Sequence, residues 1–169
     1  MRPAAALLAL SLCLAAAACD DEPASDARDK KVVATENQHK LPQWLTAQDK
    51  IEPAVWLRSR EVGREVLASD PEVDRLRRAF HQTETRFFED ERMIANRTAQ
   101  TGDMLAEIGQ AERAVDIMTG MIDVADVTPK KLPYGDLCQH YVNLRKTGQD
   151  RSAALSQLSE AYKAQNGLR

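Results

Sequence analysis

The sequence predicts an all-α protein, built from antiparallel helical hairpins or a bundle of about five helices behind an N-terminal tether. From residue 41 onward, no stretch of useful length alternates between apolar and polar residues, as a half-buried strand would require. Apolar residues instead recur at spacings of three, four and seven, which is typical of a helix with one buried face. Glycine and proline divide these periodic stretches into segments of helix length.

The N-terminal segment has the composition of a secretory signal. Met1 and Arg2 form a short positive start, and residues 3–18 form an apolar run that ends in small residues. A membrane-spanning helix needs roughly 20 apolar residues, and here acidic residues follow the shorter run at once. The stretch Ala16-Ala17-Ala18-Cys19-Asp20 resembles the lipobox of bacterial lipoproteins. Cleavage without lipidation, as in an ordinary secreted protein, is the alternative.

The resemblance implies that residues 1–18 are removed as a signal peptide and that Cys19 is lipidated. The lipid bilayer is then a predicted partner, reached through acylated Cys19. Lipoproteins of this class carry several acyl chains, and two or more chains are needed for stable attachment. Asp20 resembles a retention signal of enterobacterial lipoproteins, which predicts the periplasmic face of the inner membrane, with the outer membrane as the alternative.

Residues 19–40 are predicted to be a lipidated, disordered linker, and residues 41–169 the helical domain. The linker consists mostly of charged and small polar residues, so it cannot bury enough apolar surface to offset the entropy of ordering. The domain begins with Leu41-Pro42-Gln43-Trp44-Leu45. Because proline disfavours helix at the residue before it, we expect these residues to form a docked extended segment.

The apolar periodicity, together with the positions of proline, glycine and capping residues, predicts five helices. Pro53 and Pro71 suit first helical positions, and Ser69 or Asp70 is the expected cap before Pro71. The predicted helices span about 53–67, 71 to at least 98, 111–125, 136–146 and 150–165. The second helix extends to residue 108 if Gly102 only weakens it, since one glycine costs about 1 kcal/mol relative to alanine.

Each predicted helix has an apolar face for a common core. The expected core residues are Val55, Trp56, Val62, Val66, Val73, Leu76, Phe80, Phe87, Ile94, Ala114, Val115, Met118, Met121, Ile122, Leu137, Tyr141, Leu144, Ala154, Leu155, Leu158, Ala161 and Tyr162. The acidic run 89–91 is expected to lie on the solvated surface of the second helix.

Residues 108–115 and 147–154 are similar to one another at a spacing of 39 residues. In each, a glycine (Gly109 or Gly148) ends one helix, and a small residue follows where the next helix packs close. Residues 96–166 weakly resemble degenerate tetratricopeptide repeats. The residues that carry the resemblance in the first unit are Gly102, Leu105, Gly109, Ala114, Met118 and Met121. A closed helical bundle also needs a glycine at helix ends and a small residue where helices cross. The pattern therefore fits both a closed bundle and a repeat stack.

Charge and cysteine content narrow the function classes. After removal of the signal, 22 Lys and Arg stand against 26 Asp and Glu, so the chain lacks the basic excess that nucleic-acid binding requires. With Cys13 removed and Cys19 acylated, Cys138 stands alone and cannot form an internal disulfide. Burial in the core is the expected state of Cys138, with an intermolecular disulfide or a reactive role as alternatives.

We identify no catalytic, cofactor-binding or metal-binding motif in the sequence. His81 and Glu84 are three residues apart on one helix, but no second such pair exists, so a solvated pair is the better interpretation. Cys138 and His140 are two residues apart, which places them on different faces of a helix.

The leading functional hypothesis is a non-enzymatic, membrane-tethered module that binds an unidentified protein of the cell envelope. Candidate partner contacts are Met118, Met121, Tyr134 and Tyr141, although methionines fill core gaps more often than they bind partners. A second hypothesis is a small-ligand or metal-responsive helical domain that uses His81, Cys138 and His140. A cell-wall enzyme is the third.

Overall fold

The computed structural model describes residues 41–165, and the regular secondary structure in this range is helical. The predicted signal peptide, Cys19 and the linker of residues 19–40 lie outside the described residues. The six helices are α1 (Pro53–Val62), α2 (Pro71–Thr83), α3 (Glu91–Glu107), α4 (Ala114–Ala125), α5 (Tyr134–Lys146) and α6 (Arg151–Gln165). Residues 41–165 contain no strand, only an isolated bridge between Phe87 and Leu132. The all-α prediction is confirmed, with six helices in place of about five.

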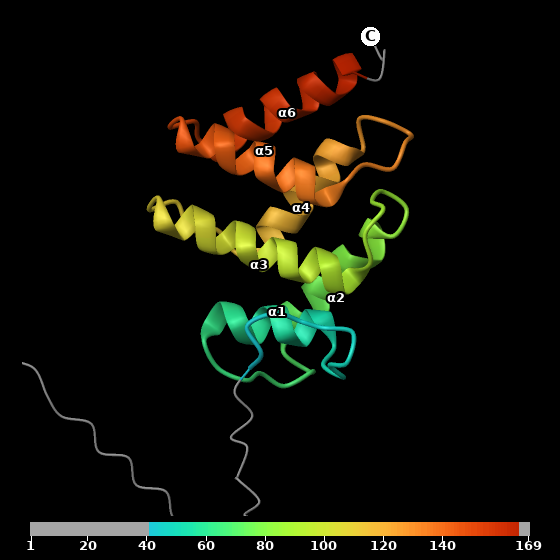
Figure 1. Cartoon of the computed structure of the whole chain (residues 1–169), viewed down its shortest axis with the longest axis vertical. Helices are drawn as coiled ribbons and strands as arrows, with labels where there is room; N and C mark the ends of the chain where they lie inside the picture. Colours follow the sequence, from blue (N-terminus) through green and yellow to red (C-terminus); the bar gives the residue numbers. More distant parts are fainter. Residues whose placement is uncertain (1–40, 166–169) are drawn as a thin grey trace, which may run out of the picture. The chain divides into compact units, whose positions relative to one another are not determined.

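The helices pair in chain order into three hairpins, α1–α2, α3–α4 and α5–α6, which stack on one another (Figure 1). Helix α3 packs against α1 and α5, and α4 packs against α2 and α6. The first helices of the hairpins therefore form one row and the second helices another. None of the helices within residues 41–165 is both long enough and apolar enough to cross a membrane.

The core runs continuously through the stack, and it contains most of the apolar residues expected there. The largest fully buried side chains are Trp56, Leu57, Leu76, Phe80, Phe87, Ile94, Leu105, Ile117, Met118, Met121, Tyr134 and Tyr141. Val55, Val66, Val115, Leu144 and Leu155 are partly buried against this core. Ala161 is exposed, against expectation. The Cys138 thiol is buried, as predicted, and burial raises its pKa to about 12.

The predicted long second helix is wrong, because residues 84–90 interrupt it. Phe87 is buried there, with its ring edge-on to Tyr134 at a centroid distance of 4.9 Å. The Leu132 N–H donates to Arg86 O at 2.9 Å, and the Phe88 N–H donates to Leu132 O at 3.3 Å. Pairing with a distant loop thus replaces helical hydrogen bonds at this point, and a new helix begins at Glu91.

The acidic run 89–91 caps helices instead of covering a helix surface. The Asp90 carboxylate accepts the Met93 N–H at 2.7 Å and so caps the start of α3. The Glu89 carboxylate accepts the N–H groups of Tyr134 and Gly135, at 2.9 and 3.0 Å, at the start of α5. Glu89 therefore satisfies donors that would otherwise be unpaired at a helix end and joins two hairpins.

Glycines with positive φ end three of the helices. Gly63 (φ +70°) ends α1 about a turn earlier than predicted, and the Arg64 N–H donates to Ser59 O in the C-cap. Gly109 (φ +71°) and Gly148 (φ +88°) follow α3 and α5, where the sequence predicted caps. Gly102, in contrast, lies inside α3 without breaking it.

Alanine substitutions at Gly109 and Gly102 are expected to have opposite effects on stability. Gly109→Ala forces a Cβ into the left-handed region and should lower the free energy of unfolding by about 1 kcal/mol. At Gly102 an added Cβ would meet Ile117 Cδ1 at 3.7 Å, an ordinary contact, so Gly102→Ala should raise it by up to about 1 kcal/mol. Urea unfolding followed by circular dichroism measures both. A loss of stability at Gly102 would contradict this packing.

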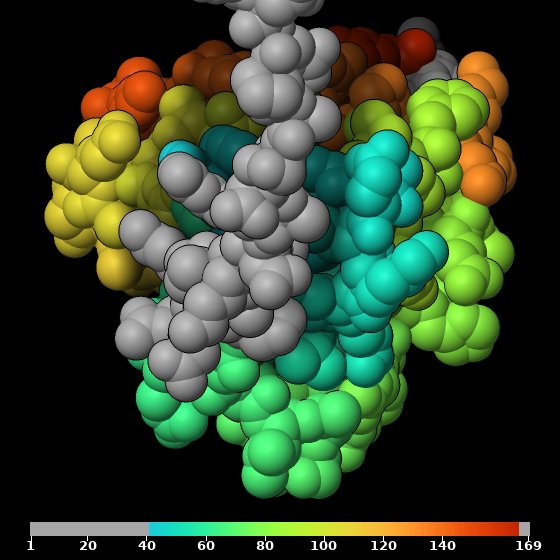
Figure 2. Space-filling model, turned by 60° about the horizontal axis from the view of Figure 1, so that its bottom comes forward, coloured from blue at the N-terminus to red at the C-terminus, as the bar shows by residue number. Residues whose placement is uncertain are grey.

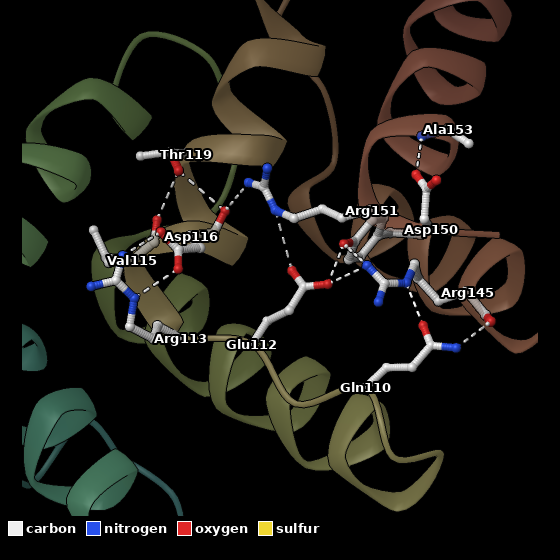
Figure 3. A network of polar contacts seen from close by, with 11 residues as sticks. Gln110, Glu112, Arg113, Val115, Asp116, Thr119, Arg145, Asp150, Arg151 and Ala153 are labelled. Atoms are coloured by element: carbon white, nitrogen blue, oxygen red, sulfur yellow. Dashed lines mark hydrogen bonds and ion pairs between the residues drawn. The ribbon is translucent and has the colours of Figure 1, made fainter. Parts of the chain in front are cut away.

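A buried network of charged and polar side chains joins the second hairpin to the third (Figure 3). Glu112, in the loop before α4, pairs with Arg145 of α5, and each side chain is only 9% exposed. The Tyr141 hydroxyl donates to Glu112 Oε1 at 2.6 Å, and Arg145 Nε donates to Gln110 Oε1 at 2.5 Å. Arg151 of α6 lies 3.5 Å from Glu112 Oε2. These contacts fix the position of α5 and α6 against the α3–α4 loop.

Removing one partner of the buried Glu112–Arg145 pair should strongly lower the free energy of unfolding. Arg145→Met leaves the Glu112 carboxylate buried without its main counter-charge and should cost about 3 kcal/mol of unfolding free energy. In the double variant Glu112→Gln/Arg145→Met, the loss of unfolding free energy should be at least about 1 kcal/mol smaller than the sum of the losses in the two single variants. Arg151→Met, at a side chain 42% exposed, is the control and should cost less than about 1 kcal/mol. Strict additivity in the double variant would contradict a coupled pair.

Candidate docking surface

The predicted docked segment at the start of the domain packs against α1 and α3. Residues 41–46, called the docked segment below, are not helical. Leu45 is buried in the core and Leu41 is partly buried against it, while Gln43, Trp44 and Thr46 remain exposed. Figure 2 brings this side forward and shows cyan atoms of the segment and of the residues after it at the surface.

Side chains of α1 and α3 bind the backbone of the docked segment. Trp56 Nε1 donates to Pro42 O at 2.9 Å, and Arg60 Nη1 donates to Gln43 O at 3.0 Å. Asn96 binds Leu45 twice: its Oδ1 accepts the Leu45 N–H and its Nδ2 donates to Leu45 O, both at 2.8 Å. We call the surface formed by Trp56, Arg60 and Asn96 the docking surface. It satisfies backbone groups that no secondary structure satisfies.

Helix geometry explains why these side chains work together. Trp56 and Arg60 are four residues apart and so lie on one face of α1. The Trp56 ring is fully buried, and its N–H therefore needs a partner, which the segment supplies. The Arg60 guanidinium lies over the rings of Trp44 and Trp56, at 5.6 and 5.7 Å from their centroids. Asp103 of α3 holds the same guanidinium at 2.5 Å and fixes its orientation.

A hollow of about 280 Å³ lies beside the docked segment. We call it the side hollow; it is lined by Trp44, Glu89, Met93, Asn96, Arg97, Gln100 and the edge of the buried Tyr134. Trp44 and Met93 are 41% and 46% exposed, so the hollow has an apolar wall that solvent reaches. Asn96 lines the hollow and also binds the docked segment, so the two features are continuous.

Arg97 gives the side hollow a cationic group. Its Nη1 donates to Gln100 Oε1 at 2.6 Å, and among residues 41–165 it has no ion-pair partner. A Cβ at Gly135 would lie 3.2 Å from Arg97 Nε, so the glycine leaves room for the guanidinium beside the start of α5. The hollow therefore combines an apolar wall, amide groups, the Glu89 carboxylate, whose oxygens already accept two N–H groups, and a guanidinium without an ion-pair partner in the described part of the chain. Such a set suits a peptide segment with an acidic group.

Comparison with known proteins places the chain in a family. The family model MoxZ matches residues 54–163, which is more than half of the chain and runs from α1 into α6. The chain belongs to the MoxZ family. No curated protein and no solved structure matches it. The MoxZ match contains Trp56, Arg60 and Asn96, whereas the docked segment precedes it.

The four partner contacts predicted from the sequence are not on the surface of this MoxZ-family domain. Met118, Met121, Tyr134 and Tyr141 are all at most 1% exposed, which corrects that prediction. The methionines fill the core, and the two tyrosine hydroxyls bind Thr98 and Glu112 inside the stack. Their size and spacing suited a core and a surface equally, and packing between hairpins decided the outcome. Cys19 lies outside the described residues.

The residues of the ligand-responsive hypothesis occupy separate environments. His81 is exposed on α2 beside Glu84, with a closest distance of 3.9 Å, as expected for a solvated pair. Cys138 is in the core, and His140 Nδ1 lies 3.3 Å from the Tyr162 hydroxyl. In the described part of the chain, no three His, Cys, Asp or Glu side chains are arranged to hold a metal ion.

The sequence alone did not indicate the docking surface. Asn96 attracts notice only as part of the formal glycosylation sequon Asn96-Arg97-Thr98. Its partner Leu45 is 51 residues away, so no local spacing reveals the contact. The one available signal was Leu41-Pro42-Gln43-Trp44-Leu45, whose apolar residues predicted a docked segment but not the surface that receives it.

Proposed function

We propose that this protein is a lipid-anchored, periplasmic protein-interaction module of the bacterial cell envelope, without enzymatic activity of its own. The N-terminal signal and the lipobox-like stretch support attachment through acylated Cys19. Asp20 supports the inner membrane as its location. The tether would place the helical domain close to envelope proteins that share the membrane.

The observation that carries the proposal is the docking surface with its side hollow. The domain already binds one non-helical chain segment through backbone groups, and the hollow continues from that segment along α3 toward α5. A partner segment lying in the hollow would place apolar side chains against Met93. Its backbone would meet the amide of Gln100, and an acidic side chain would pair with Arg97.

The partner that fits this chemistry is an envelope protein with an exposed, non-helical segment that carries both apolar and acidic residues. The stacked hairpins fix the hollow through α3, the start of α5 and Glu89, which is bonded to two N–H groups of α5. The hollow is thus preformed, and less entropy is lost on binding than with a mobile surface.

Cross-linking in cells, followed by detergent solubilisation and pull-down of the tagged full chain, tests the proposal. The native chain should recover one or a few envelope proteins, and Cys19→Ala should lose them together with its place in the membrane fraction. Arg97→Glu should reduce recovery by about tenfold or more, because a charge-assisted hydrogen bond becomes a repulsion.

Arg78→Glu is the matched control, because Arg78 is also exposed and has no ion-pair partner among residues 41–165. It should recover the same proteins as the native chain. The proposal fails if the native chain comes down alone under conditions that preserve known complexes. It also fails if Arg97→Glu and Arg78→Glu recover the same proteins in the same amounts.

A further inference from the structure

We infer that the docked segment is an exchangeable occupant of the docking surface, and that the partner's own non-helical segment takes its place. The inference rests on the proposed function and adds how the partner is selected and how binding is controlled. In the unbound protein, residues 41–46 occupy the surface as an internal ligand. In the complex, a peptide segment with a leucine-like residue at the position of Leu45 occupies it.

The hydrogen bonds that hold the segment do not depend on its side chains. All four hydrogen bonds from Trp56, Arg60 and Asn96 reach backbone atoms, which every peptide offers. Among its side chains, Leu45 is buried, at 3% exposure, Leu41 is partly buried against the core, and Trp44 lies beneath the Arg60 guanidinium. A surface of this kind accepts any chain that can adopt the same path and present one apolar residue to the pocket.

The chain around the segment is built so that release does not unfold α1. Thr46, the last residue of the segment, begins a turn that is closed by its own contacts, because Asp49 Oδ2 accepts from both Thr46 N and Thr46 Oγ1, at 2.7 and 2.8 Å. These hydrogen bonds lower the pKa of Asp49. Beyond the turn, Glu52 binds Arg77 of α2 through both oxygens, at 2.6 and 2.7 Å. The start of α1 is therefore held independently of residues 41–46.

The segment also connects directly to the predicted tether. Residues 41–46 follow the linker of residues 19–40, so their release lengthens the chain between the lipid anchor and the folded domain. An internal ligand competes at an effective concentration on the order of millimolar, so a partner segment must bind well to displace it. Weakening the internal segment should consequently strengthen binding of an external one.

A labelled peptide with the sequence of residues 38–50 tests the exchange, titrated into the full chain carrying Cys19→Ala in mild detergent. Leu45→Ser in the protein weakens the internal ligand and should raise peptide affinity at least about tenfold by fluorescence anisotropy. Asn96→Ala added to Leu45→Ser should abolish that gain, because Asn96 holds either occupant. Leu67→Ser, at an exposed leucine, is the control and should leave affinity unchanged.

Equal affinity of the native and Leu45→Ser proteins would overturn the inference, as would a peptide carrying the same Leu45→Ser change that binds equally well. If Leu45→Ser loses its helical circular dichroism, NMR of the native protein decides. Excess peptide should then shift the resonances of residues 41–45 to disordered values, and unchanged resonances would overturn the inference. A partner that is recovered by pull-down but is not displaced by the peptide leaves the proposed function intact and refutes the exchange.

Discussion

Burial of the central hairpin between its two neighbours is the constraint on which the structure depends. Helix α3 presents core residues to both α1 and α5, and α4 does so to α2 and α6. Ile94, Leu105, Met118 and Met121 are fully buried, which a single hairpin could not achieve. Because each hairpin covers the next, the charged network at Glu112 and the cap supplied by Glu89 hold positions that hydrophobic packing has already brought together.

A stack of hairpins has two ends, and here they are covered differently. Beyond α5, the last helix α6 buries only Ala154, Leu158 and Tyr162, and the rest of its surface is largely polar. At the other end, within residues 41–165, no further hairpin covers α1, and the docked segment protects Trp56 and satisfies its N–H. A short segment held through its backbone gives less stability than a packed helix, which is why we assign function to this end.

Local signals in the sequence predicted what is local in the structure. Gly109 and Gly148 predicted helix ends because a residue at positive φ favours glycine whatever its surroundings. The break at residues 84–90 was not predictable, because it depends on Leu132, a residue from a loop beyond α4. Asn96 and Leu45 are 51 residues apart, and no periodicity in the sequence indicates their contact. Tyr134 and Tyr141 were proposed as partner contacts, although Tyr141 was also expected in the core, because amphipathic aromatic residues suit both cores and interfaces.

Native-state hydrogen exchange of the Leu45 amide tests most directly whether residues 41–46 detach from a folded domain. Its N–H donates to Asn96 Oδ1, so it should be protected, yet with an opening free energy at least about 2 kcal/mol below that of the Leu105 amide inside α3. Low denaturant should accelerate exchange at Leu105 and leave Leu45 nearly unaffected. Equal opening free energies and equal denaturant dependence would show that the segment is a permanent part of the core and would contradict the exchange.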